Sequence, residues 1–113
     1  ACERLARLYW YTVEFGLIAT PAGLRAYGAG ILSSAGELRY SVQSREPQRL
    51  GFDLERIMRT RYRIDSYQAS YFVIDSFAQL FEATAPDFTP LYRRVADAGD
   101  LEADAQLPTD KRF

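Results

Sequence analysis

The chain has 113 residues, which is enough for one compact domain and too few for two ordinary ones. Hydrophobic residues make up 48% and charged residues 26%, so the composition is globular and not that of a disordered chain. The formal net charge of -1 comes without a basic cluster, and no apolar stretch approaches the roughly 20 residues of a membrane span, so we expect neither nucleic acid nor a membrane as a partner.

Two residue types limit the chemistry further. The chain has no histidine, which excludes a self-contained Ser/His/Asp triad, a Cys/His pair and any metal site that draws imidazole from these residues. The single cysteine, Cys2, cannot form an internal disulfide, and no secretory signal pattern opens the chain, so we expect a cytoplasmic setting. A helical pattern begins within three residues of Ala1, and we interpret the chain as a fragment.

The first expected element is a helix over residues 3–15, which Gly16 ends. Its apolar side chains recur at spacings of three and four, at Leu5, Leu8, Tyr9, Thr12 and Phe15. In the next segment, residues 20–23 (Thr-Pro-Ala-Gly) have proline and glycine at positions that suit a turn. The sequence therefore predicts a short hairpin over residues 17–24.

Two helices and one strand are expected in the middle of the chain. Ser34 and Glu37 have the spacing of a capping box, so a helix should begin there. Asp53 is a candidate cap for a further helix, and the β-prone run 71–74 predicts a strand.

Two more helices should close the domain. Ser76 and Gln79 form a second capping-box match, and Thr89 places a capping hydroxyl before Pro90 at the first helical position. Hydrophobic periodicity is lost after residue 98, so we expect a domain over 1–98 and an acidic, flexible tail over 99–113. The expected fold is mainly α with a few short β-strands, an α+β arrangement.

Glu14 is the residue that is hardest to assign from spacing. A 100° step per residue puts it on the side of Glu3 and Arg7, which favours a solvated face, and Arg4 and Arg7 beside Glu3 fit a solvated charge cluster. Its neighbours three and four positions away are all apolar or aromatic: Trp10, Tyr11, Leu17 and Ile18. A carboxylate in such surroundings is costly to bury unless a cation or strong donors compensate it, as happens for ligands and catalytic acids. Spacing alone leaves both interpretations open.

Two longer blocks carry a family resemblance. Residues 8–17 (LYWYTVEFGL) resemble the Y-W-[FY]-T-V-E-F-G-L motif of the aromatic amino acid hydroxylases. Residues 27–38 (YGAGILSSAGEL) resemble the Y-G-A-G-[IL]-L-S-S-x-G-E-L block of the same family. The similarity continues through 51–58 and 71–77, covers most of residues 3–95, and is strongest to the single-domain bacterial members.

The resemblance implies a metal and a substrate site. The family hydroxylates an aromatic amino acid with O₂ and a tetrahydropterin at a non-haem Fe(II) held by two His and one carboxylate, and Glu14 matches that carboxylate. Trp10, Gly30 and Ser33 match the amino acid pocket, and Glu37 matches a residue that supports the network around the substrate's polar end. We expect Glu14 to project into an apolar-lined concavity that Trp10, Gly30 and Ser33 approach.

Each assignment has a structural alternative. Trp10 could belong only to the core, Gly30 could only relieve a turn, and Ser34 with Glu37 could simply cap a helix.

The resemblance also implies a pterin site, and it implies that part of the catalytic domain precedes this chain. Ala6 and Tyr9 match contacts to tetrahydrobiopterin or a related tetrahydropterin, and the bacterial likeness favours L-phenylalanine as substrate. The two His ligands, the aromatic residue that stacks on the pterin and the arginine that pairs with the substrate lie upstream in the family, so the expected partner is the N-terminal part of the same catalytic domain. The alternative hypothesis is a truncated, non-catalytic remnant that serves as a structural or interaction module.

Overall fold

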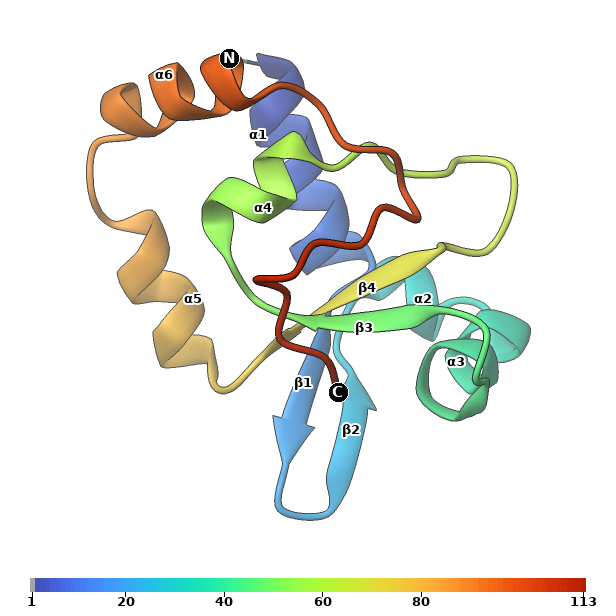
Figure 1. The fold of residues 1–113 in the computed structure, drawn as a ribbon. Helices are drawn as coiled ribbons and strands as arrows, with labels where there is room; N and C mark the ends of the chain where they lie inside the picture. The colour runs from blue at the N-terminus through green and yellow to red at the C-terminus, as the bar shows by residue number, and fades with distance from the viewer. Residues whose placement is uncertain (1) are drawn as a thin grey trace.

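The computed structural model describes residues 2–113 and has the expected α+β class (Figure 1). In chain order its elements are α1 (Cys2–Tyr9), the π-helix η1 (Trp10–Glu14), β1 (Leu17–Thr20), β2 (Gly23–Ala26), α2 (Ala29–Leu32), α3 (Ala35–Gln43), β3 (Gln48–Gly51), α4 (Leu54–Arg59), β4 (Ser70–Ile74), α5 (Phe77–Thr84) and α6 (Thr89–Ala98). In Figure 1, α1, α4 and α6 gather at one end of the molecule and the β1–β2 hairpin projects from the other. None of the helices in this described part is long and apolar enough to cross a membrane.

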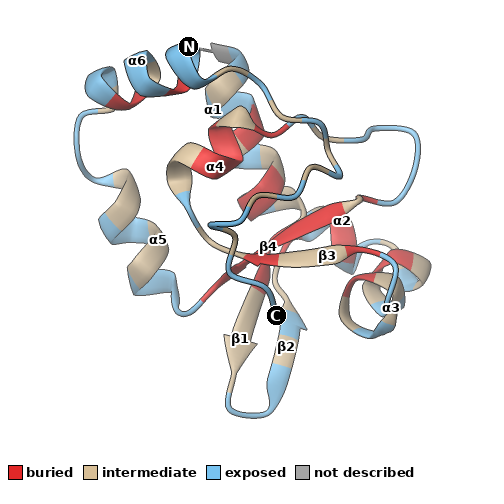
Figure 2. Cartoon of the chain, viewed as in Figure 1, coloured by how far each residue is buried: buried red, intermediate tan, exposed pale blue. Residues whose placement is uncertain are grey.

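A four-stranded mixed sheet with the order β2-β1-β4-β3 organises the core. The central strand β4 runs parallel to both β1 and β3, while β2 is antiparallel to β1. Every residue of β4 is buried, as Figure 2 shows in red, which is typical of a strand covered on both faces. Side chains alternate along it, so Phe72 packs with Tyr11 and Ile57 while Tyr71 packs with Leu17 and Ile31. The sheet therefore separates two apolar clusters.

The expected hairpin and strand are confirmed. Thr20 pairs with Gly23 across the β1–β2 turn, and the Thr20 hydroxyl accepts from Ala22 N at 3.2 Å. Gly23 has a φ of 114°, a backbone conformation that favours glycine. The run 71–74 lies within β4.

Three predicted helix caps are present, but the two predicted capping boxes lack their reciprocal bond. The side chains of Ser34, Asp53 and Ser76 accept from backbone N–H groups three residues later, at 3.2, 3.0 and 3.1 Å. The Gln79 side chain accepts instead from Asp75 N, and the Glu37 carboxylate turns into the core.

The cap predicted at Thr89 is wrong. Thr89 is already the first helical residue of α6, and Phe88 at the N-cap position makes no side-chain cap. Asp87 Oδ1 accepts from both the backbone N and the hydroxyl of Thr89, at 2.9 and 2.8 Å. The carboxylate two residues earlier therefore holds this helix start, because it can reach both donors at once.

The solvated charge cluster predicted around Arg7 is also wrong. The Arg7 side chain is only 3% exposed and donates to Met58 O at 3.0 Å, to Asp100 at 2.9 Å and to Glu3 at 2.7 Å. Arg4 reaches the same two acceptors from α1, Met58 O and Asp100. The hydrogen bonds from Arg7 and then Arg4 hold the pKa of the Asp100 carboxyl well below its usual value. Local spacing could not show this, because two of the three acceptors lie more than fifty residues away in sequence.

Residues 99–113 differ from the loose tail that composition predicted. They contain no helix among the described residues, yet Leu101 N donates to Arg59 O at 2.6 Å and Gly51 N donates to Lys111 O at 2.7 Å. Asp110 pairs with Arg56 at 2.9 Å, and both side chains are largely buried. Figure 1 shows this red segment running back over α4 and β3. Backbone pairing and one buried ion pair fix its path, and neither leaves a hydrophobic period in the sequence.

Candidate functional site

The helix that carries Glu14 changes its winding before it reaches that residue. The expected single helix is α1 followed by η1, in which Phe15 N donates to Trp10 O, five residues back, at 2.8 Å. Within the same stretch the Thr12 hydroxyl donates to Leu8 O at 2.6 Å, a local bond that often bends a helix. A π-turn takes up an extra residue, so Glu14 is rotated from the position that a uniform 100° step predicts.

The Glu14 carboxylate is half-buried and has no ionic partner in the part of the chain that the structure describes. The ion pairs there use Glu3, Glu55, Glu102, Asp100 and Asp110 instead. Glu14 is therefore neither fully exposed nor compensated. Glu14 does not line any of five cavities found among the described residues, so the apolar concavity expected around it stays a prediction.

Two glycines of the second motif block lie against the Glu14 turn. A Cβ on Gly30 would lie 3.0 Å from Glu14 Oε2, 3.0 Å from Glu14 O and 2.8 Å from the Phe15 ring. A Cβ on Gly28 would collide with the Glu14 carbonyl oxygen and lie 2.6 Å from Gly16 N. Only glycine allows this approach, so the two motif blocks do come together at Glu14.

Trp10 and Ser33 are linked to this contact through Phe15 and Gly30. The Trp10 ring stacks on Tyr62 with centroids 4.3 Å apart and an angle of 12°, and packs on Phe15 at 4.8 Å. Its Nε1 is buried without a hydrogen-bond acceptor in the described residues. The exposed Ser33 hydroxyl donates to Gly30 O at 3.0 Å. Trp10, Phe15, Gly30 and Ser33 thus form one chain of contacts beside Glu14.

Glu37 lies in a buried polar network. Its side chain is 6% exposed, and its Oε2 accepts from the Tyr71 hydroxyl at 2.6 Å and from Gln68 N at 3.2 Å. Burial, and then the hydrogen bond to the Glu37 carboxylate, raise the pKa of Tyr71 far above its ordinary value. The sequence placed Tyr71 only in a strand, since nothing local links it to a residue 34 positions away.

The two residues matched to the pterin, Ala6 and Tyr9, are exposed on α1. Leu5, Tyr9 and Val13 are 41%, 53% and 47% exposed and follow one another at intervals of four, so they form an apolar stripe on the surface. Of the apolar residues whose spacing predicted this helix, Leu5 and Tyr9 are therefore on its exposed side. Tyr11 on the other side of the helix is fully buried.

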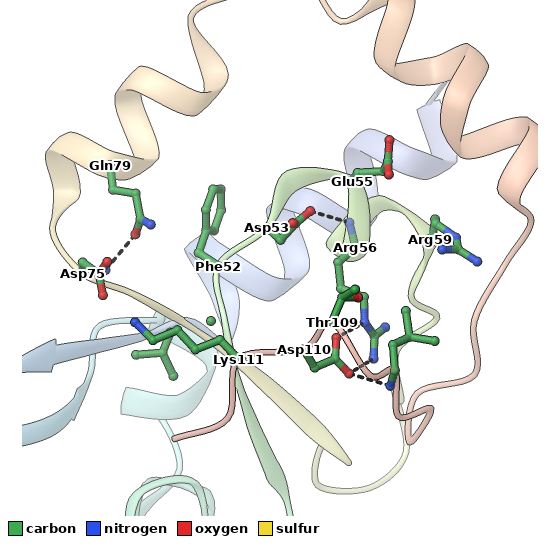
Figure 3. A pocket seen from close by; sticks show the side chains of 13 residues that line it. Phe52, Asp53, Glu55, Arg56, Arg59, Asp75, Gln79, Thr109, Asp110 and Lys111 are labelled. Carbon is green, nitrogen blue, oxygen red and sulfur yellow. Dashed lines mark hydrogen bonds and ion pairs between the residues drawn. The ribbon is translucent and has the colours of Figure 1, made fainter.

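Sequence reasoning missed a cavity of about 200 Å³ near the ends of β3 and β4 (Figure 3). Its polar lining is largely used within the protein, because Asp53 caps α4, Gln79 bonds to Asp75 N, and Asp110 pairs with Arg56. None of the residues assigned to the iron, the substrate or the pterin lines it.

Comparisons with known proteins agree with the two motif blocks. The model of the biopterin-dependent aromatic amino acid hydroxylases matches residues 1–93. The phenylalanine-4-hydroxylase of Chromobacterium violaceum is 66% identical over 110 residues, and that of Ralstonia nicotianae 62% identical over 118 residues. These alignments cover 97% and 99% of this chain but only 37% and 38% of the two relatives.

Solved structures give the same result. A crystal structure of a C. violaceum phenylalanine hydroxylase mutant matches with a TM-score of 0.96 at 63% identity, covering 99% of this chain and 42% of that one. The structure of the C. violaceum enzyme bound to cobalt matches with a TM-score of 0.95 at 64% identity, covering 98% and 40%. The chain therefore belongs to the family of biopterin-dependent aromatic amino acid hydroxylases.

Proposed function

We propose that this chain is the C-terminal part of the catalytic domain of a phenylalanine 4-monooxygenase, which converts L-phenylalanine, a tetrahydropterin and O₂ to L-tyrosine. The similarity to two proteins named phenylalanine-4-hydroxylase supports the substrate. Because the chain spans less than two fifths of those relatives, the activity belongs to the full-length protein. By this we mean the chain joined to the preceding part of its catalytic domain. The cytoplasmic setting is part of the proposal.

The observation that carries the proposal is the half-buried carboxylate of Glu14, which has no ionic partner in residues 2–113 and lies against glycines of the second motif block. Such a group fits a metal ligand, since a cation would compensate its charge. No cluster of three or more His, Cys, Asp or Glu side chains in residues 2–113 could hold a metal, so Glu14 would supply one ligand and the upstream His pair the others. Fe(II) held in this way would provide the positions at which O₂ is activated.

The residues beside Glu14 would bind and orient the amino acid. Trp10 offers an aromatic surface and a buried Nε1 donor that has no acceptor among the described residues, and Gly30 leaves the space next to Glu14 Oε2 unfilled. The Ser33 hydroxyl is exposed and can turn toward a ligand, and the Glu37 carboxylate can accept from the substrate's polar end. These residues would position the substrate, while the iron and the pterin would supply the chemistry.

Tetrahydrobiopterin or a related tetrahydropterin would lie beside Ala6 and Tyr9, which are both open on the surface of α1. The stripe of Leu5 and Tyr9 on α1 and Val13 on η1 suits contact with the rest of the catalytic domain, because an apolar stripe on a soluble domain normally meets a partner surface.

The test uses the full-length protein with Glu14→Ala, and measures iron content and pterin-dependent formation of tyrosine. Glu55→Ala is the matched control, because Glu55 is also partly exposed but pairs with Arg94 at 2.8 Å. We expect Glu14→Ala to lose both iron and activity while Glu55→Ala keeps them. Near-normal values for Glu14→Ala would show that it is only a helix-surface glutamate.

The second candidate function is the non-catalytic remnant, and the single metal ligand and the exposed apolar stripe are the features that favour it. The coding sequence upstream of Ala1 separates the two proposals. A His-x-x-x-x-His pair in frame would support the enzyme, and an unrelated sequence or a stop codon would support the remnant.

A further inference from the structure

Tyr71 is a buried side chain whose hydroxyl, its only polar group, is bonded to Glu37, a candidate substrate-binding residue. It lies at the second position of the central strand β4, and its ring is enclosed by Leu17, Ile31 and Val73. The hydroxyl donates to Glu37 Oε2 at 2.6 Å, a length typical of a strong bond to a carboxylate. A ring held on all sides by packing can fix the direction of that bond.

The bonds to the Glu37 carboxylate are one-sided. Tyr71 and Gln68 N both donate to Oε2, and no residue of the described range 2–113 donates to Oε1. Oε1 is also absent from the buried polar atoms that lack a partner, which are Trp10 Nε1 and Tyr27 Oη, so it keeps contact with solvent. None of the ion pairs in that range uses Glu37. The carboxylate is therefore anchored through one oxygen and open at the other.

We propose that Tyr71 is a positioning residue for substrate binding, which anchors Glu37 through Oε2 so that Oε1 is presented to the donors of an amino acid ligand. The inference rests on the proposed function, because it takes L-phenylalanine as the ligand. Without the Tyr71 hydroxyl, Glu37 keeps only the longer bond from Gln68 N and its carboxylate can rotate. The loss acts on binding of the substrate's polar end and leaves the metal ligand Glu14 untouched.

The test compares Tyr71→Phe with Tyr11→Phe in the full-length protein. Tyr11 is the matched control, since it is equally buried in the sheet's other cluster and its hydroxyl donates to a backbone carbonyl, Arg61 O. We expect Tyr71→Phe to raise the KM for L-phenylalanine about tenfold with a kcat within about twofold of wild type, as for loss of a hydrogen bond to a charged group. Tyr11→Phe should leave this KM unchanged. A lower folded fraction would reduce the apparent kcat and leave KM as it is, so a stability loss cannot imitate the result.

A double-mutant cycle separates positioning from packing. Because Tyr71 acts through Glu37, adding Tyr71→Phe to Glu37→Gln should raise the KM by less than about twofold more. Additive effects, or a KM for Tyr71→Phe equal to that of Tyr11→Phe, would overturn the inference while leaving the proposed function in place. A wild-type protein that neither binds nor hydroxylates L-phenylalanine would overturn both.

Discussion

Carboxylates near the two ends of the chain have opposite surroundings. Glu14, in the π-turn, is half-buried and has no ionic partner among the described residues. Asp110, in the C-terminal segment, is almost completely buried and paired with Arg56, and Asp100 is bonded by Arg4 and Arg7. The paired acids hold distant segments together. The carboxylate of Glu14 has no cation among the described residues, so it is available to bind a cation from outside them. A half-buried acid without a cation among the described residues is thus a better guide to function than an acid in a buried ion pair.

The largest effect is expected when the 113-residue chain is studied alone. We expect it to bind Fe(II) weakly and to form no tyrosine from L-phenylalanine, tetrahydropterin and O₂, because one carboxylate cannot supply the facial site that this iron needs. Calorimetric titration with Fe(II) under anaerobic conditions and a tyrosine assay would measure both. Tyrosine formation by the chain alone would contradict the role given to Glu14 and the upstream His pair.

Displacing the Glu14 turn without touching its carboxylate is the next test. Gly28→Ala places a methyl group against the Glu14 carbonyl oxygen and Gly16 N, which are backbone atoms that cannot swing aside. In the full-length protein we expect the affinity for iron to fall by about tenfold or more, as when a support of a metal ligand is lost. Ala29→Ser, at an exposed neighbour, is the control. Equal iron content in the two variants would mean that the glycine contact does not set the position of Glu14.

Removing the cation of a buried ion pair should lower the stability of the protein and leave its iron content unchanged. Arg56→Ala leaves Asp110 buried without its cation, so we expect the free energy of unfolding to fall by about 3 kcal/mol. Arg61→Ala removes exposed pairs with Glu102 and Asp100 and should cost less than about 1 kcal/mol. Urea denaturation of the two variants measures the difference. Similar losses for both would show that burial does not distinguish these pairs.

The smallest expected effect is the loss of stability at low pH that comes from protonation of Asp100. The folded pKa of Asp100 lies below its unfolded value of about 3.9, so its contribution to stability is present above that pH and is lost as the pH falls through the folded pKa. Asp100→Asn should therefore lower stability at pH 7 by no more than about 1 kcal/mol, and make it less dependent on pH below 4. Denaturation curves at pH 7 and pH 3 would detect this. Parallel acid sensitivity in both proteins would exclude Asp100 as a source of it.

Local features of the fold could be predicted from the sequence and long-range ones could not. The hairpin at Gly23 and the caps at Ser34 and Asp53 follow from residue types within a few positions, and the structure confirms them. The π-turn before Glu14 and the burial of Arg7 depend on distant packing that no local period records.

The same limit applies to the candidate site. Resemblance to the family supplied Glu14, Trp10, Gly30, Ser33 and Glu37, and their roles remain predictions. Spacing alone left Glu14 open between a surface residue and a ligand. The support that Tyr71 gives to Glu37 crosses 34 residues and became visible only in three dimensions.

The last three residues close an open side of the sheet. Strand β3 is the outermost strand of the order β2-β1-β4-β3, and on its free side Gly51 N donates to Lys111 O while Phe113 N donates to Arg49 O. Leu50 and Arg112 form an antiparallel bridge between them. An uncovered edge offers a row of backbone donors and acceptors to any other extended chain, which is a route to aggregation. Truncation before Lys111 would thus turn a covered sheet edge into a template for strand addition, a hazard for expression that has no connection with catalysis.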